Sequence, residues 1–74
     1  MSDNGNIYRR IEVVGSSSTS IEDAIENAIA RAAKTTENLE WFEIVETRGH
    51  IEDGSRVGHY QVILKLGFRI IEPS

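Results

Sequence analysis

The chain has 74 residues and a mass of 8.3 kDa, enough for one small domain. A core of this size rarely supplies more than about 3–5 kcal/mol without a disulfide, a metal or self-association, and the sequence contains no cysteine. We therefore expect an oligomer. The net charge of −4 argues against a nucleic-acid or anionic-membrane surface, and no apolar run is long enough to span a membrane.

The first six residues are polar, and we expect them to be disordered beside a single domain over residues 7–72. They lack the basic and apolar regions of a secretory signal, so we expect a cytoplasmic protein. Residues 7–14 alternate between apolar and polar side chains, as a half-buried strand does. The serine-rich segment 15–20 is interpreted as a turn that leads into a helix, with Thr19 or Ser20 as the N-cap.

Residues 21–34 carry the clearest signal and predict an amphipathic helix that ends near Thr35 and Thr36, with Asn38 as a left-handed residue. Acidic side chains lie in its first turn and basic ones in its last, which suits the helix dipole. The apolar stripe is mostly alanine and isoleucine, so a sheet can approach it closely. The stripe consists of Ile21, Ala24, Ile25, Ala28, Ile29 and Ala32.

Two further strands are predicted over residues 39–51 and 56–71, joined by Asp53-Gly54, a strong hairpin signal. The chain is therefore predicted to be an α+β protein of β-α-β-β order, with a three-stranded antiparallel sheet packed on one helix. A final strand of about 14 residues would run roughly 46 Å, whereas the helix would cover only about 21 Å. The uncovered apolar length is a second reason to expect self-association.

Few residues suggest chemistry by themselves. The sequence shows no hydrolase nucleophile, no phosphate-binding loop and no pair of carboxylates suited to acid–base catalysis, so we do not expect an enzyme. His50 and His59 could face each other across the hairpin and bind a metal. We interpret them instead as two isolated surface histidines, and expect no metal site.

Trp41, Gln61 and Arg48 remain as candidate ligand-binding residues, although a core residue, a solvated strand residue and a surface ion pair are their ordinary interpretations. A turn centred on Asp53-Gly54 would place Arg48 opposite His59 and make Arg48 and Gln61 diagonal neighbours. Trp41 has the other strand parity. It could join them only through a β-bulge or from another subunit.

Several short segments follow one another in a distinctive order over residues 7–72. They are Tyr8-Arg9-Arg10-Ile11-Glu12-Val13-Val14-Gly15-Ser16-Ser17, Ala30-Arg31-Ala32-Ala33-Lys34-Thr35, Leu39-Glu40-Trp41-Phe42-Glu43, Arg48-Gly49, Tyr60-Gln61-Val62 and Gly67-Phe68-Arg69. Their order and spacing together resemble the dodecins, small flavin-binding proteins with the strand–helix–strand–strand order predicted above. Dodecins assemble as hollow spherical dodecamers built from trimers, so the resemblance implies a homododecamer.

The resemblance also implies roles for individual residues. Trp41 would stack on the isoalloxazine ring, Gln61 would hydrogen-bond its pyrimidine edge, and Arg48 would line the same pocket. Arg69 would lie near the ribityl phosphate. The resemblance favours FMN over riboflavin and related flavins. Some relatives also bind coenzyme A, for which the matching positions here are Tyr8, Arg31, Thr35 and Thr36.

The implied function is flavin storage, buffering and photoprotection. In the family, two flavins lie between tryptophans of twofold-related subunits, and such aromatic layers leave little room for a substrate at the reactive centre of the flavin. Two alternatives are kept. One is a small flavin-dependent oxidoreductase, and the other is a purely structural oligomer whose interface contains a tryptophan.

Overall fold

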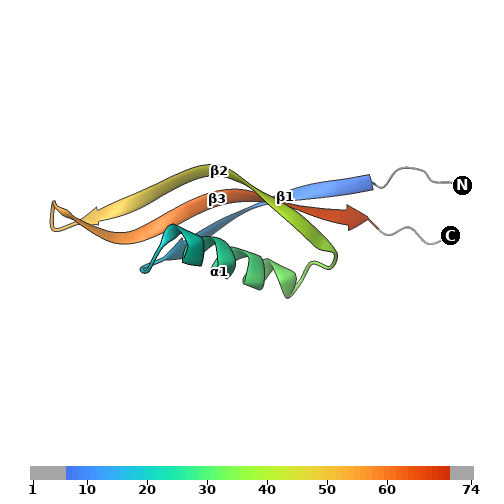
Figure 1. The fold of residues 1–74 in the computed structure, drawn as a ribbon, viewed down its shortest axis with the longest axis horizontal. Helices are drawn as coiled ribbons and strands as arrows, with labels where there is room; N and C mark the ends of the chain where they lie inside the picture. Colours follow the sequence, from blue (N-terminus) through green and yellow to red (C-terminus); the bar gives the residue numbers. More distant parts are fainter. Residues whose placement is uncertain (1–6, 71–74) are drawn as a thin grey trace, which may run out of the picture.

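The computed structural model describes residues 7–70, which form one helix packed on a three-stranded antiparallel sheet (Figure 1). The elements are β1 (Ile7–Ser17), α1 (Ile21–Ala33), β2 (Leu39–Glu52) and β3 (Arg56–Ile70), with the strands in the order β1-β3-β2. The predicted α+β class and β-α-β-β order are confirmed. The disorder expected for residues 1–6, and the last residues of the predicted domain 7–72, lie outside the described residues.

The core lies between α1 and the two strands that it covers, β1 and β3. Three alanines of α1 are buried against three large apolar side chains of β3, and the six residues are Ala24, Ala28, Ala32, Val62, Leu64 and Leu66. Alanine has no bulk beyond Cβ, so the helix axis comes close to the sheet. A Cβ on Gly15 would meet the backbone oxygen of Ala24 and lie 2.8 Å from the Ala28 Cβ.

The turn predicted over residues 15–20 begins too early, because residues 15–17 belong to β1. Gly15 pairs with Val62 as a strand residue, and β1 continues to Ser17 before the chain turns. Of the two candidate N-caps, Ser20 caps the helix, because its Oγ accepts from the Asp23 N–H at 3.0 Å. The capping box does not close, since the Asp23 carboxylate instead accepts from the Ser17 Oγ at 2.6 Å.

The hairpin between β2 and β3 is present, but its register differs from the prediction. Asp53 and Gly54 have φ values of 54° and 71°, as a tight turn requires, and the loop also includes Ser55. A β-bulge at Gly58 then adds one more residue to β3. These two extra residues place Arg48 opposite Gln61 rather than opposite His59.

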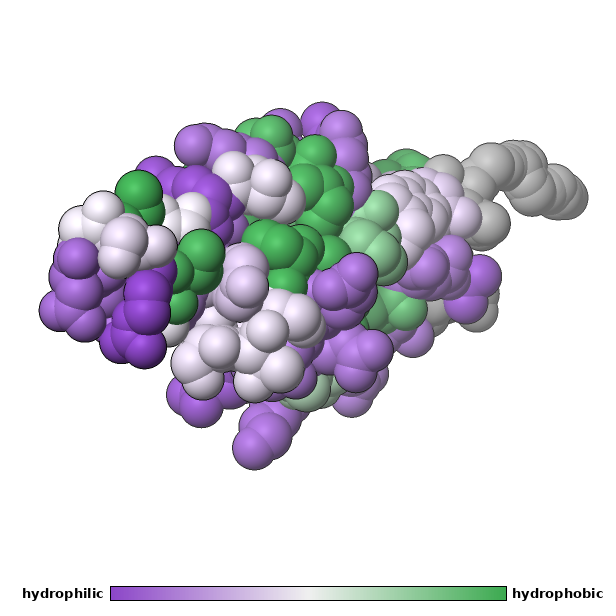
Figure 2. Space-filling view, turned by 60° about the vertical axis from the view of Figure 1, so that its left-hand side comes forward, coloured by the Kyte–Doolittle hydropathy of each residue, from purple (hydrophilic) through white to green (hydrophobic). Residues whose placement is uncertain are grey.

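The hairpin projects well beyond α1, so part of the sheet has no cover within the chain (Figure 1). Phe42 and Ile44 of β2 are 47% and 39% exposed, although they share the core face of the sheet. Nearer the turn, Ile51 and Val57 are 67% and 57% exposed. Figure 2 shows apolar surface gathered across the middle of one side of the molecule, flanked by hydrophilic side chains. Exposed apolar surface of this kind is typical of proteins that associate.

Candidate functional site

One residue of β2, Val45, decides which side chains share the face of the sheet away from α1, here called the outer face. Val45 is the extra residue of a β-bulge, because Ile44 pairs with Leu64 whereas Glu46 pairs with Ile63. The bulge reverses the strand parity between Trp41 and Arg48. Both side chains therefore belong to the outer face, although the bulge that gives them a shared face does not bring them close together.

Trp41 lies over Gly67, its partner on β3. A Cβ on Gly67 would be 2.6 Å from the Cε2 of the indole, so only a glycine leaves room for the ring in this position. The ring of Tyr8 lies beside it, with centroids 4.6 Å apart and planes tilted by 56°. Trp41 nevertheless remains 44% exposed. The outer face thus carries a positioned, half-exposed aromatic ring.

Arg48 and Gln61 face each other directly across β2 and β3 on the same outer face. The Arg48 Nε donates to the Gln61 Oε1 at 2.6 Å. They line a hollow of about 200 Å³ together with Gly49, His50 and His59. The bond uses the amide oxygen of Gln61, while the amide nitrogen brings two further donors to this region.

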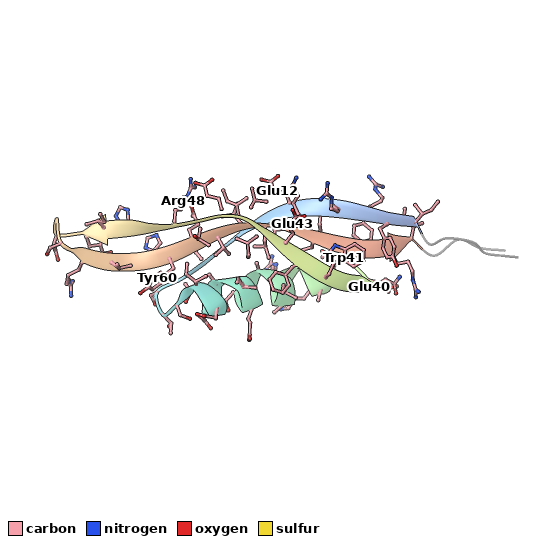
Figure 3. The ribbon with its side chains drawn as sticks, turned by 45° about the horizontal axis from the view of Figure 1, so that its top comes forward. Glu12, Glu40, Trp41, Glu43, Arg48 and Tyr60 are labelled. Atoms are coloured by element: carbon pink, nitrogen blue, oxygen red, sulfur yellow. The ribbon has the colours of Figure 1, made fainter. Side chains whose placement is uncertain are left out.

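Trp41 is well separated along the sheet from Arg48 (Figure 3), and therefore from Gln61, the partner of Arg48 on β3. Trp41 pairs with Gly67 of β3, and Gly67 and Gln61 are six residues apart on that strand, which corresponds to about 20 Å. Charged side chains lie on the outer face between them, including Glu43, which forms an ion pair of 3.1 Å with Arg10. A single three-ring system stacked on Trp41 cannot reach Gln61 of the same chain.

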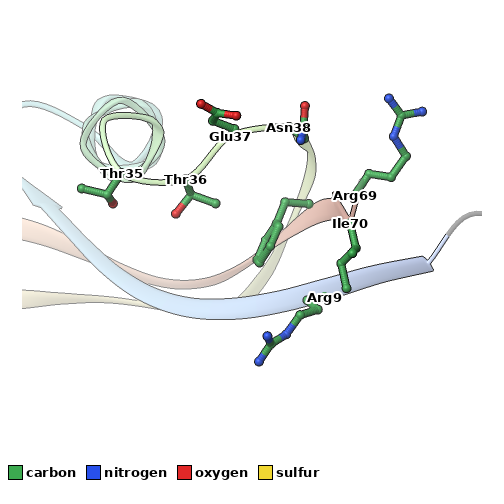
Figure 4. Close-up of a pocket in the computed structure, with 8 residues that line it drawn as sticks. Arg9, Thr35, Thr36, Glu37, Asn38, Arg69 and Ile70 are labelled. Carbon is green, nitrogen blue, oxygen red and sulfur yellow. The ribbon is translucent and has the colours of Figure 1, made fainter. Parts of the chain in front are cut away.

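Arg69 belongs to a different region from Arg48 and Gln61. It lines a pocket of about 550 Å³ beyond the end of α1 (Figure 4), which Thr35, Thr36 and Arg9 also line. The Arg69 Nε lies 3.6 Å from the Glu40 carboxylate but is buried without a hydrogen-bond partner among the described residues. The Arg69 guanidinium points away from Thr35 and Thr36 (Figure 4), so the pocket brings an arginine and two threonines to one region without placing their polar atoms side by side.

The other two residues assigned to coenzyme A lie elsewhere. Tyr8 contacts Trp41, and Arg31 is exposed on α1 and does not line the pocket with Thr35 and Thr36. Arg9 and Asn38 do line it, and the sequence analysis did not single them out as ligand-binding residues. Asn38 has the left-handed conformation predicted for it, with φ of 68°, and its carbonyl accepts from the Arg69 N–H at 3.1 Å.

Two wider properties concern the same part of the chain. Residues 7–70 contain no helix long and apolar enough to cross a membrane. They also contain no cluster of three or more histidine, cysteine or acidic side chains arranged to hold a metal ion.

The close contact between the Trp41 indole and Gly67 gives a first testable prediction. Gly67→Ala should push the indole away from β3 and cost about 1–3 kcal/mol, as overpacking does. Trp41 is the only tryptophan, so intrinsic emission reports on this ring alone. We expect a shifted emission maximum and a lower melting temperature. Lys65→Ala, on the same strand and face, is the control and should leave the emission unchanged. A wild-type emission spectrum for Gly67→Ala would contradict the position of the Trp41 indole over Gly67.

Comparison with known proteins identifies the family. The family model described as Dodecin matches residues 7–71. A curated dodecin from Thermus thermophilus is 47% identical over 68 residues, which cover 92% of this chain and 97% of that protein. The structure of a Streptomyces coelicolor dodecin aligns with a TM-score of 0.86 at 48% identity, over 96% of this chain and all of the other.

The dodecin from Streptomyces davaonensis is similar to the same degree, with a TM-score of 0.86 and 45% identity over 93% of this chain and 100% of that chain. The predicted resemblance is therefore confirmed by sequence and by structure. The family is known for binding flavins rather than for catalysis. The chain belongs to the dodecin family of small flavin-binding proteins.

Proposed function

We propose that this protein binds FMN, stores and buffers it, and protects it from light by stacking its isoalloxazine ring on the indole of Trp41. The observation that carries the proposal is the half-exposed indole, positioned over Gly67 and beside Tyr8 on the outer face. A flat aromatic ligand gains about 0.5–1.5 kcal/mol from each offset stacking contact, in addition to its buried area. The membership of this chain in a flavin-binding family also supports a flavin as the ligand.

The polar end of the pocket is assigned to Gln61 and Arg48. Gln61 would hydrogen-bond the pyrimidine edge of the ring, which offers both donors and acceptors, as an amide does. Arg48, already bonded to Gln61 at 2.6 Å, would hold that amide in place and line the pocket. Because these residues lie about 20 Å along the strand from Trp41, they would come from a neighbouring copy of the chain.

Assembly follows from this division of the pocket. We assign the protein to a hollow homododecamer built from trimers, located in the cytoplasm. The apolar side chains that α1 leaves exposed on β2 and on the hairpin, among them Phe42, Ile44 and Ile51, would be covered by other subunits. The outer strands of the sheet, β1 and β2, also have one free edge each within the chain.

Phosphate groups are assigned to the pocket beyond α1. Arg69 would pair with the ribityl phosphate of FMN, because its guanidinium can donate several charge-assisted hydrogen bonds and its Nε has no hydrogen-bond partner among residues 7–70. Coenzyme A is proposed as a second ligand near Thr35 and Thr36, with Tyr8 and Arg31 contributing from neighbouring surfaces. Arg69 lines the pocket that contains both threonines, so the two phosphate ligands would compete for it.

Storage fits the site better than catalysis. A ring enclosed between indoles has no open face for a hydride donor, and the described outer face offers no arranged acid–base pair. A small flavin-dependent oxidoreductase would instead oxidise NAD(P)H through many turnovers. A purely structural oligomer would remain colourless after addition of flavin. Both alternatives are separated from storage by the Trp41 experiment below.

The assembly is tested by light scattering on the purified chain. The expected particle contains about twelve subunits at micromolar concentration, because the exposed apolar faces and the divided pocket both require neighbouring chains. A stable monomer or dimer would contradict the assembly, and it would also remove the proposed flavin pocket.

Trp41→Ala tests the stacking. FMN emission should fall almost to zero on binding to the wild type, because the indole donates an electron to the excited ring. The variant should bind FMN more weakly by about 1–3 kcal/mol, and the FMN that still binds should regain emission. Trp41→Phe retains a smaller ring and should give an intermediate affinity. The measurement is a fluorescence titration, followed by an assay of NAD(P)H oxidation.

The outcome of this titration separates the three functions. Bright emission from wild-type-bound FMN, or repeated turnover with NAD(P)H, would defeat the storage proposal. Light scattering on Trp41→Ala provides the control for assembly, since the strand pairing of β2 with β3 does not depend on the indole. A variant that retains the particle but loses FMN assigns the loss to stacking.

Gln61→Leu tests the pyrimidine contact. Leucine has a similar volume but neither donor nor acceptor, so FMN affinity should fall by about 1–3 kcal/mol through loss of a buried hydrogen bond. Lys65→Leu places the same side chain on the same strand and face, four residues away, and should change the affinity little. If Gln61→Leu binds FMN as tightly as the wild type does, Gln61 is an ordinary solvated strand residue that does not contact the ligand.

A further inference from the structure

His50 and His59 face each other on the outer face, close to the hairpin turn. Their rings are stacked, with centroids 5.2 Å apart and planes inclined by 19°, and both side chains are exposed. Both are surface residues as predicted, but they are not isolated from each other. The pair closes one end of the hollow that Arg48 and Gln61 also line.

The bulge at Gly58 produces this pairing. Near the turn, Ile51 pairs with Val57, and the extra residue Gly58 then brings His59 opposite His50. Without the extra residue, regular alternation would place Gly58 opposite His50 and turn His59 toward the other face. The bulge therefore determines that two imidazoles, rather than one, occupy the same cross-strand position.

We propose that His50 and His59 form a cross-strand clamp for a divalent transition-metal ion such as Zn²⁺ or Ni²⁺. Neutral imidazole is a common ligand for these ions. Two Zn–N bonds of about 2.1 Å can join nitrogens up to about 4 Å apart, which rings with centroids 5.2 Å apart reach by rotation about their side-chain torsions. The adjoining hollow of about 200 Å³ has room for the water molecules that would complete the coordination.

The charged neighbours define what the clamp can bind. On β2, Arg48 is positive, but its Nε is engaged by Gln61. The carboxylate of Glu52 lies over Gly58, the residue before His59, and brings negative charge to the same end of the hairpin. Residues 7–70 supply no third ligand already in place. The site should therefore prefer nitrogen-seeking ions over Ca²⁺ and Mg²⁺, which require several oxygen ligands.

The test is a calorimetric titration of Zn²⁺ and Ni²⁺ into the untagged full chain in a non-coordinating buffer. We expect one ion per chain. The sequence has only two histidines and no cysteine, so His50→Gln and His59→Gln each remove half of the imidazole ligands. Each variant should weaken binding at least about tenfold, because the clamp requires both rings. Arg56→Gln, a substitution in the same hairpin, should bind as the wild type does.

A second measurement follows the stability of the hairpin. An ion that binds only the paired strands raises the melting temperature of the wild type, and this rise should be absent from both histidine variants. Ca²⁺ at the same concentration should raise neither. The proposal is overturned if the wild type takes up no Zn²⁺ or Ni²⁺, or if either histidine variant retains wild-type affinity, which would assign the ion to carboxylates.

Discussion

The site depends on a single unpaired residue, Val45 in β2. Strand side chains alternate between faces, so Trp41 and Arg48, separated by seven residues, would lie on opposite faces of a regular sheet. The bulge at Val45 cancels that difference and gathers both on the outer face. The same shift keeps Phe42 and Ile44 on the core face. One residue thus separates the outer face, with its candidate site, from an apolar face on a strand only 14 residues long.

The central strand, β3, determines how far Trp41 lies from the Arg48–Gln61 pair. β3 is paired on both sides, and its core face carries Val62, Leu64 and Leu66, so it cannot shift without losing the core. Gly67 provides the space for Trp41 at one position, and Gln61 receives Arg48 at another. The rigid strand holds these two features apart. A ligand that uses both must lie between chains, which connects the chemistry of the pocket to the uncovered apolar surface.

Much of this could be predicted from the sequence, and the errors have local causes. The element order, the alanine stripe and a helix N-cap at Thr19 or Ser20 follow from local sequence patterns, and the structure selects Ser20. The end of β1 was misplaced because glycine and serine normally indicate a turn, whereas Gly15 here allows close contact with α1. The cross-strand register failed for a similar reason, since bulges such as those at Val45 and Gly58 leave no clear mark in the alternation of side chains.

The candidate residues show the same limit. Residue type and family resemblance were enough to select Trp41, Gln61 and Arg48 as candidates. The alternation of side chains along the strands did not reveal that Arg48 pairs with Gln61 or that the Trp41 indole lies over Gly67. His50 and His59 were underestimated because their contact depends on the bulge at Gly58. Residue types can be read from the sequence, whereas the contacts between them depend on bulges that it does not reveal.

The proposed division of the pocket between chains has an energetic consequence for so small a domain. Only six apolar residues are buried within residues 7–70, so the isolated fold has little stability of its own. A ligand that binds only where two copies meet stabilises the assembled state by mass action, to a degree set by its concentration relative to its dissociation constant. Under the proposed function, flavin would be both the stored molecule and a structural component. The half-exposed Trp41 would then be an exposed aromatic ring in the isolated chain and a buried wall in the loaded particle.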